Sequence, residues 1–202
     1  MDPTDVERYR DRPAFHAADP ARWRAWLTEH HDDPEPGVWL VTWRRESGHE
    51  TFGYEPWIEE ALAFGWIDGQ ASVVDVDRHA LWFTRRRRGS RWTRLSKERV
   101  ARVEADGRMT DAGRAVVAAA QADGSWTRHD DAEALVVPDD LAAALAARPG
   151  ARAAFDAFTP GVRRSVLGWL ADARRAETRE RRVAETADQA ARGVAAHQLR
   201  RG

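Results

Sequence analysis

A change of hydrophobic pattern near Trp92 is the feature that most constrains the fold of this 202-residue chain. Before it, segments such as "GVWLVTWRR" (residues 37–45) are rich in β-branched and aromatic residues, which is typical of strands. After it, alanine-rich segments place apolar residues at helical spacing. We therefore expect an α+β fold, in which an N-terminal antiparallel sheet with helices is followed by a C-terminal all-helical unit.

The sequence of the N-terminal half predicts that helices and β-hairpins alternate along the chain. Asp19 is an N-cap candidate before Pro20, and Gly65 is suited to end a second helix. The strand at 37–45 has apolar residues on both faces, so we expect it in the centre of the sheet. The predicted elements are a helix from Pro20, a strand at 37–45, a short return strand at 50–54, a helix at 55–65 and a hairpin of 70–77 with 78–86.

The second half predicts a series of short helices. Ser96, Thr110 and Thr159 are N-cap candidates, and Pro160 suits the first turn that follows Thr159. The short loops between these helices favour antiparallel neighbours. The domains expected are an α+β unit at 15–95 and a helical unit at 96–193, with 1–14 and 194–202 flexible.

The absence of cysteine excludes several classes of function. Without thiols the chain has no disulfide framework, no thiolate zinc site and no cysteine nucleophile. The N-terminal residues "MDPTDVERYR" are polar throughout, and no apolar run reaches the roughly 18–20 residues needed to span a bilayer. We therefore expect a cytoplasmic protein without membrane insertion.

Enzyme and metal signatures are weak. The chain has no G-x-S-x-G elbow, P-loop, G-x-G-x-x-G or H-E-x-x-H motif, so we predict no cofactor and no catalytic residue. The segment "EHHDDPE" (29–35) gathers two histidines with four acids, but a solvated helix end explains it better than a metal site. The segment "ESGHE" (46–50) is interpreted as a tight turn and not as a catalytic triad.

The charge of the chain is concentrated in one segment. Residues 85–102 hold nine basic side chains and one acid, a charge of +8, and since the net charge is −1 the remainder carries −9. A basic segment interleaved with Trp82, Phe83 and Trp92 is compatible with a single-stranded nucleic-acid groove. The isoelectric point near 6.7 argues against this alternative, because nucleic-acid-binding domains commonly have isoelectric points above about 9.

Two segments hold the residues best suited to recognition. The segment "EEALAFGWIDG" (59–69) places Trp66 and Asp68 at a helix–strand junction, where a carboxylate can orient an arginine or a ligand amine. The segment "WFTRRRRGSRWT" (82–93) supplies a guanidinium fork at Arg86 for carboxylates or phosphates. The alternative is structural: Asp68 and Gly69 form an ordinary turn pair, and Arg86 pairs with Asp68 to hold the second hairpin on the first helix.

In this order and spacing, "EALAFGWIDGQ", "WFTRRRRGSRWT" and "DGRMTDAG" resemble the YdeI/OmpD-associated family, also called bacteriocin-protection proteins. The resemblance extends through "VVPDDLAAALAARPG" and the helices after it, and it covers roughly residues 26–193. The family pattern has Cys, Pro and Asn where this chain has Ala63, Arg85 and Ser96, so these three are poor functional candidates, and it often has Pro where this chain has Asp111. The resemblance implies protection from a bacteriocin or an antimicrobial peptide, and association with an outer-membrane porin.

The leading hypothesis is a non-enzymatic cytoplasmic protein that binds a small-molecule or peptidic antimicrobial in a tryptophan-walled cleft. A nucleic-acid-associated regulator and a toxin-modifying enzyme are the alternatives, and the oligomeric state stays unassigned. Asp68 would accept a hydrogen bond, Arg86 and Ser90 would hold an anionic or carbonyl group, and the aromatic rings would stack. The candidate ligand-binding residues are Trp66, Asp68, Phe83, Arg86, Ser90 and Trp92.

Overall fold

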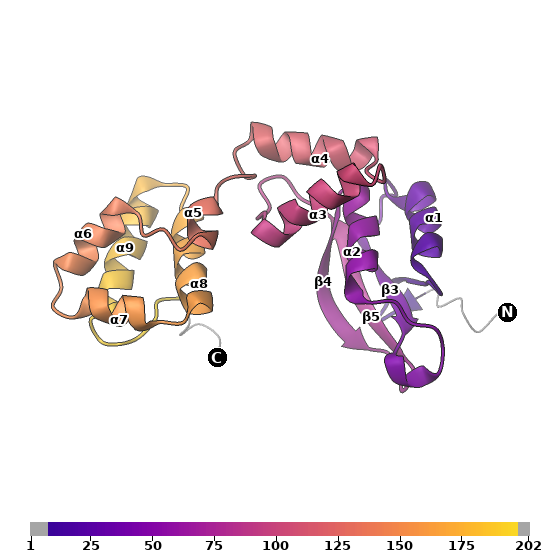
Figure 1. Cartoon of the computed structure of the whole chain (residues 1–202), viewed down its shortest axis with the longest axis horizontal. Helices are drawn as coiled ribbons and strands as arrows, with labels where there is room; N and C mark the ends of the chain where they lie inside the picture. Colours follow the sequence, from indigo (N-terminus) through magenta and orange to yellow (C-terminus); the bar gives the residue numbers. More distant parts are fainter. Residues whose placement is uncertain (1–7, 198–202) are drawn as a thin grey trace. The chain divides into compact units, whose positions relative to one another are not determined.

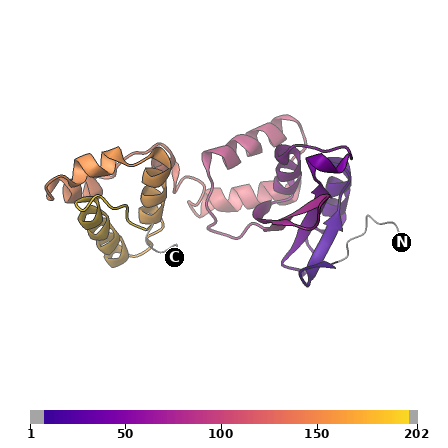
Figure 2. The same ribbon diagram turned by 90° about the horizontal axis from the view of Figure 1, so that it is seen from below.

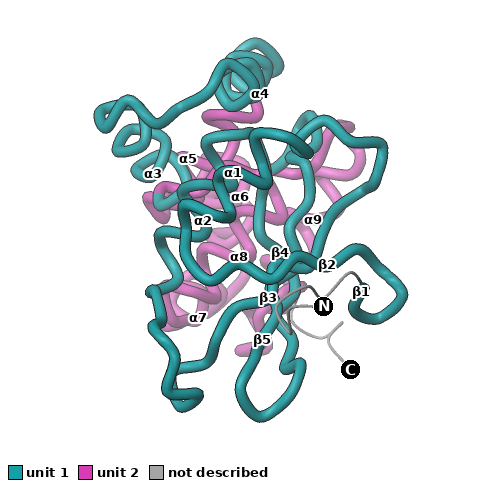
Figure 3. Tube along the Cα trace, turned by 90° about the vertical axis from the view of Figure 1, so that its right-hand side faces the viewer, with its two compact units in different colours: residues 1–90, 95–123 teal, residues 91–94, 124–202 magenta. Residues whose placement is uncertain are grey.

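The computed structural model describes residues 8–197, which form two compact units (Figures 1 and 3). Unit 1 comprises the described residues up to 90 together with 95–123, and unit 2 comprises 91–94 together with the described residues from 124 onward. Unit 1 contains a five-stranded sheet, whereas the described part of unit 2 consists of helices joined by short loops (Figure 2). The predicted α+β class with a helical C-terminal region is therefore confirmed.

The sheet of unit 1 has the strand order β1-β2-β3-β5-β4. Neighbouring strands run antiparallel except β2 and β3, which pair in parallel. A parallel pair needs a crossover connection, and α1 (Pro20–His30) provides it between β2 and β3. The predicted antiparallel sheet is thus mixed at this one pair. The strands are β1 (Arg8–Tyr9), β2 (Arg12–His16), β3 (Gly37–Trp43), β4 (Trp66–Val73) and β5 (Arg78–Arg85).

Part of the two ends that we expect to be flexible, 1–14 and 194–202, lies outside the described residues. Within the described part, residues 8–14 contribute to β1 and β2. Tyr9 is held at the sheet edge, because its hydroxyl lies 2.8 Å from Ser72 Oγ and donates to the Val73 carbonyl oxygen at 2.8 Å. At the other end, Ala195 and Ala196 are buried.

Helices α1 and α2 (Tyr54–Ala63) contact each other, and α2 also contacts β4 (Figure 1). Asp19 caps α1 as predicted, since its carboxylate accepts from the Arg22 N–H at 2.8 Å. The predicted return strand at 50–54 is wrong: a 3-10 turn, η1 (Arg45–Ser47), leads instead into α2. The physical reason is that β3 already pairs with β2 on one side and β5 on the other, so no edge is left for another strand.

Strand β3 is central, as its pattern predicts, and its two faces build two different layers. Val38 and Leu40 are buried on the face that also carries Phe83 of β5, which meets the ring of Trp23 on α1 at 5.3 Å between centroids. Trp39 and Val41 are buried on the opposite face. Full burial of such side chains contributes about 1.5–3 kcal/mol each.

Helices α3 (Arg94–Ala105) and α4 (Asp111–Ala122) complete unit 1. Thr110 caps α4 as predicted, but α3 begins at Arg94, so Ser96 does not cap it. The Thr110 hydroxyl also donates to the carbonyl oxygen of Ala63 on α2 at 2.6 Å, which ties the start of α4 to the end of α2. The domain boundary predicted between residues 95 and 96 marks the change from mixed to helical secondary structure. The boundary between the compact units falls later, between residues 123 and 124.

Unit 2 buries a core of aliphatic residues with one phenylalanine. Leu141, Leu145, Phe155, Val166 and Leu170 are each at most 1% exposed. Thr159 caps α8 as predicted, accepting from the Val162 N–H. No helix within residues 8–197 is long and apolar enough to cross a membrane. The helices of unit 2 are α5 (Asp130–Glu133), α6 (Asp139–Ala146), α7 (Ala151–Ala157), α8 (Pro160–Ala171) and α9 (Ala176–Ala190).

Substituting Gly113 tests the close approach of α4 to α2. A Cβ at Gly113 would lie 2.3 Å from the Ala63 carbonyl oxygen and 2.6 Å from Met109 Sδ, and a backbone oxygen cannot move aside as a side chain can. We expect Gly113→Ala to lower the free energy of unfolding by about 1–3 kcal/mol, measured by urea denaturation. The matched control is Gly161→Ala in α8, where a Cβ meets nothing within 4 Å and stability should be unchanged or slightly higher. Equal stability of Gly113→Ala and the parent protein would contradict the packing.

A second prediction concerns pH. His129 is 1% exposed and its Nε2 lies 2.9 Å from Asp172 Oδ1. Burial lowers the pKa of His129, against the opposing charge of Asp172. The unfolded chain therefore binds a proton more readily than the folded protein, so the stability that His129 contributes is present above about pH 6.5 and is lost as the pH falls through the folded pKa. We expect His129→Gln to flatten the decline of unfolding free energy between about pH 7 and pH 5, and an unchanged slope would refute this assignment.

Candidate functional site

A cavity of about 270 Å³ opens in unit 1 between the sheet and the start of α2. Strands β3, β4 and β5 provide one wall, and the segment that enters α2 provides the other. Its lining is mostly apolar and aromatic, with a few polar side chains among them. The lining residues are Leu40, Thr42, Phe52, Tyr54, Trp57, Ala71, His79, Ala80 and Leu81.

Local sequence explains why these side chains meet. In the β3–β5 pair Leu40 lies opposite Leu81 and Thr42 lies opposite His79, and because side chains alternate along a strand, all four point to one face. Tyr54 and Trp57 are three residues apart on α2, so they share a helix face. The cavity therefore forms where one face of the β3–β5 pair lies opposite one face of α2.

Two hydrogen-bonded pairs give the cavity its polar character. Thr42 Oγ1 and His79 Nε2 lie 3.0 Å apart, with the direction of donation set by the imidazole tautomer. Burial, and then the charge of Arg44, lower the pKa of His79, so the ring is neutral near pH 7. The Tyr54 hydroxyl donates to Asp68 Oδ2 at 2.5 Å. Neutral donors and acceptors, rather than fixed charges, thus face the cavity.

The three aromatic residues predicted to line a site are buried in the two units instead. Trp66 is 3% exposed and donates from Nε1 to the His31 carbonyl oxygen at 3.1 Å. Phe83 is fully buried. Trp92 belongs to unit 2, is 2% exposed, and lies 4.8 Å from the ring of Trp126.

The three polar candidates have separate surroundings. Arg86 is 9% exposed, and its backbone N–H donates to the Gly65 carbonyl oxygen at 2.9 Å. Burial lowers the Arg86 pKa to about 10, and the nearby charge of Asp68 opposes that shift. The Ser90 hydroxyl donates to the Arg87 carbonyl oxygen at 2.5 Å within a turn. None of the six predicted residues lines the cavity, but Asp68 reaches it through Tyr54.

Three arginines of the basic segment 85–102 form ion pairs with glutamates outside the segment. Arg99 forms a bidentate pair with Glu55 at 2.6 and 2.8 Å, and this hydrogen bonding lowers the pKa of the Glu55 carboxyl. Arg102 pairs with Glu59 at 2.9 Å. Arg91 lies in unit 2, where it pairs with Glu133 at 2.9 Å. Three of the nine basic side chains of the segment are therefore paired with acidic side chains, and nothing in these contacts favours the nucleic-acid alternative.

The two histidine-bearing segments lie at the end of α1 and at the 3-10 turn η1. In 29–35, His30 Nδ1 lies 2.8 Å from Asp33 Oδ2 at a half-exposed helix end. In 46–50, the His49 ring stacks on Trp43 at 3.9 Å, and its backbone N–H donates to Ser47 Oγ. Within residues 8–197, no three or more His, Asp or Glu side chains gather in an arrangement that could hold a metal ion.

Sequence reasoning did not find Phe52, Tyr54, Trp57 and His79. The sequence pattern places Tyr54 in a return strand and His79 in a largely apolar strand, so neither is predicted to line a site. A usable signal was present, since Phe52, Tyr54 and Trp57 form a close aromatic group. The Phe52 and Trp57 rings do meet edge to face at 5.9 Å between centroids.

Comparisons with known proteins give two matches, and the gap between them contains the boundary between units 1 and 2 at residues 123 and 124. Residues 15–116 match the family model described as Domain of unknown function (DUF8412). Residues 134–193 match the family model described as Bacteriocin-protection, YdeI or OmpD-Associated. No curated protein and no solved structure matched the chain. The second match confirms the resemblance noted from the sequence for residues 134–193, which lie wholly within unit 2. The three N-terminal motifs that carry the resemblance fall instead within the first match.

The Tyr54–Asp68 hydrogen bond has a spectroscopic test, because Tyr9 and Tyr54 are the two tyrosines of the chain. Burial and the neighbouring Asp68 raise the pKa of Tyr54 above its ordinary value of about 10. In a Tyr9→Phe variant, phenolate absorbance should therefore appear at higher pH than for free tyrosine. Adding Asp68→Asn should move that titration to lower pH, since it removes the carboxylate charge. An identical titration in both variants would argue against the contact.

Proposed function

Because this chain belongs to the family described as Domain of unknown function (DUF8412) and ends in a region of the bacteriocin-protection, YdeI or OmpD-associated family, we propose that it is a ligand-binding protein of antimicrobial protection. In this proposal, the cavity of unit 1 takes a small, largely aromatic molecule that carries one hydrogen-bond donor. The protein holds the molecule without transforming it, and it does so in the cytoplasm.

The aromatic cavity is the observation that carries the proposal. Small-molecule sites are concave and mostly apolar, with a few polar groups that fix orientation, and they usually enclose about 300–1,000 Å³. A volume of about 270 Å³ is close to the lower end of that range and suits a compact ligand. Phe52, Tyr54 and Trp57 offer ring faces and edges, and Leu40 and Leu81 offer an aliphatic wall.

In the proposal, the two hydrogen-bonded pairs favour ligands that carry a hydrogen-bond donor. The Tyr54 hydroxyl donates a hydrogen bond to Asp68. Its oxygen is therefore left to accept a hydrogen bond from a donor group of the ligand. In the proposal, Asp68 is thus a positioning residue that acts through Tyr54, which keeps part of the site expected from the sequence. The Thr42–His79 pair adds a second neutral contact at the sheet wall.

Binding without reaction follows from the same residues. A hydroxyl nucleophile needs an adjacent base, and that base in turn needs a group that orients it. Thr42 and His79 are 3.0 Å apart, but no carboxylate among the described residues hydrogen-bonds the His79 ring. Mass spectrometry of a candidate antimicrobial after incubation with the protein checks this directly. Recovery of unaltered compound is expected, and a stable mass change would favour the toxin-modifying alternative.

Binding can be measured with 2-naphthol, which has two fused rings and one hydroxyl donor. We expect saturable binding with a Kd on the order of 0.1–1 mM, followed by quenching of tryptophan fluorescence, since Trp57 lines the cavity. Ala71→Leu should fill the cavity and weaken binding at least about tenfold. The matched control is Ala101→Leu, the same change at an exposed position of α3 outside the cavity. Equal binding by the two variants would exclude this cavity.

The link to protection has its own experiment. Cells that produce the chain should survive a bacteriocin or antimicrobial to which the host is sensitive, and cells that produce Ala71→Leu should not. Ala101→Leu should protect as the parent does. Fractionation of the same cells tests the cytoplasmic location, and recovery of the protein outside the cytoplasm would contradict that part of the proposal.

A further inference from the structure

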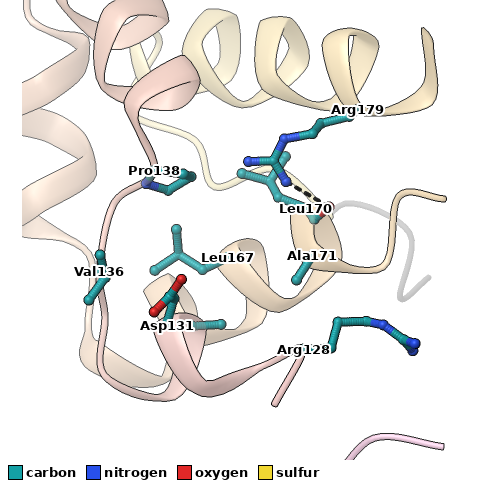
Figure 4. Close-up of a pocket in the computed structure, with 9 residues that line it drawn as sticks. Arg128, Asp131, Val136, Pro138, Leu167, Leu170, Ala171 and Arg179 are labelled. Atoms are coloured by element: carbon teal, nitrogen blue, oxygen red, sulfur yellow. Dashed lines mark hydrogen bonds between the residues drawn. The ribbon is translucent and has the colours of Figure 1, made fainter. Parts of the chain in front are cut away.

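Unit 2 contains a second cavity, of about 240 Å³, that the function proposed above does not use (Figure 4). Helices α5, α8 and α9 and the segment between α5 and α6 enclose it. The residues that line it are Arg128, Asp131, Ala132, Val136, Pro138, Leu167, Leu170, Ala171 and Arg179. All of them belong to unit 2, so the cavity is complete within that unit.

The floor of this cavity is apolar and firmly held. Leu167 is 3% exposed and Leu170 is 1% exposed, and both also belong to the core of unit 2. Val136, by contrast, is 50% exposed at the cavity wall. The preceding residue, Leu135, has a φ of +59°, a left-handed conformation that is uncommon for a residue with a side chain. A backbone hydrogen bond of 2.8 Å from Val136 N–H to the Asp131 carbonyl oxygen holds this segment beside α5.

The charged residues of the cavity are not equivalent. Arg179 forms a bidentate pair with Asp140 at 2.6 and 3.0 Å, and Figure 4 shows its remaining bond to the Leu170 carbonyl oxygen. Its charge is therefore already matched. The Arg128 guanidinium points away from Asp131 and Leu167 (Figure 4). The Asp131 carboxylate lines the same cavity as Leu167 and forms no hydrogen bond or ion pair with another side chain among the described residues.

An unmatched carboxylate next to an apolar floor suits one class of ligand. An ammonium group on the ligand would complete the charge of Asp131, while an attached ring or chain would cover Leu167 and Leu170. A carboxylate ligand would meet Asp131 with a like charge, and Arg179 is already paired with Asp140. We propose that the cavity of unit 2 is a binding site for small amphipathic amines, with Asp131 as the group that binds the ammonium.

Three ligands that share a phenylethyl or phenylpropyl body test the proposal: phenethylamine, 2-phenylethanol and 3-phenylpropionate. Each is titrated into the full chain at pH 7, and binding is followed by the backbone amide signals of residues 131–137 and 167–171 in NMR spectra. These signals separate the cavity of unit 2 from that of unit 1. We expect phenethylamine to bind roughly fivefold more tightly than 2-phenylethanol, with 3-phenylpropionate weakest, and the preference to shrink as salt rises.

Two variants identify the residues responsible. Asp131→Asn should make the affinities for phenethylamine and 2-phenylethanol equal, because it keeps the apolar floor and removes the charge. Glu180→Gln is the matched control, since it removes an exposed carboxylate on α9 outside the cavity and should leave the preference intact. Ala171→Leu should weaken both ligands by filling the space.

The result that overturns the proposal is equally specific. Tighter binding of 3-phenylpropionate, an unchanged amine preference in Asp131→Asn, or shifts confined to unit 1 would each do so. If Asp131→Asn alters the fold, the salt dependence and the ligand order in the parent protein still decide the question. Because the readout is confined to unit 2, failure here leaves the proposal for unit 1 untouched.

Discussion

Burial of β3 on both faces and along both edges organises unit 1. One face of β3 meets the layer of Trp23 and Phe83, the other carries Trp39 and Val41, and β2 and β5 take its two edges. The chain must therefore leave β3 by a turn and return through a helix, because no edge remains for another strand. Helix α2, the entry of β4 at Trp66 and the cavity between α2 and the sheet all follow from that route.

The two cavities differ in the chemistry of their polar groups. In unit 1 the polar side chains are bonded to each other, as in Thr42 with His79, so neutral donors and acceptors face the space. In unit 2 the charge of Arg179 is matched by Asp140, while that of Asp131 is not. The occupants that we propose differ accordingly: a neutral aromatic ligand for unit 1 and an amphipathic amine for unit 2. Each unit can be tested by itself, because each cavity is lined by residues of one unit alone.

Elements set by local chemistry were predictable. Asp19, Thr110 and Thr159 cap helices as their side chains and positions indicate, and Gly65 adopts the positive φ that a helix end favours. The errors arose where a distant segment decides. The short strand at 12–16 becomes visible only when it pairs with β3, and the expected strand at 50–54 fails because β5 occupies that edge.

The candidate site illustrates the same limit. Trp66, Phe83 and Trp92 are as hydrophobic as the residues that line a cavity, and only their tertiary neighbours place them in the cores. The sequence predicts that Asp68 contacts a ligand, whereas in the structure it accepts a hydrogen bond from Tyr54, fourteen positions away.

Periodicity, caps and glycines in the sequence were sufficient for the α+β class, the helical C-terminal half and most helix starts, because these depend on neighbours within a few residues. The family resemblance was also readable from the sequence, and the match at residues 134–193 bears it out for the C-terminal region. The tertiary structure alone decided the parallel β2–β3 pair, the partners of Arg99 and Arg102, and which aromatic rings face a cavity. Those outcomes depend on contacts between segments far apart in the chain, which no local pattern encodes.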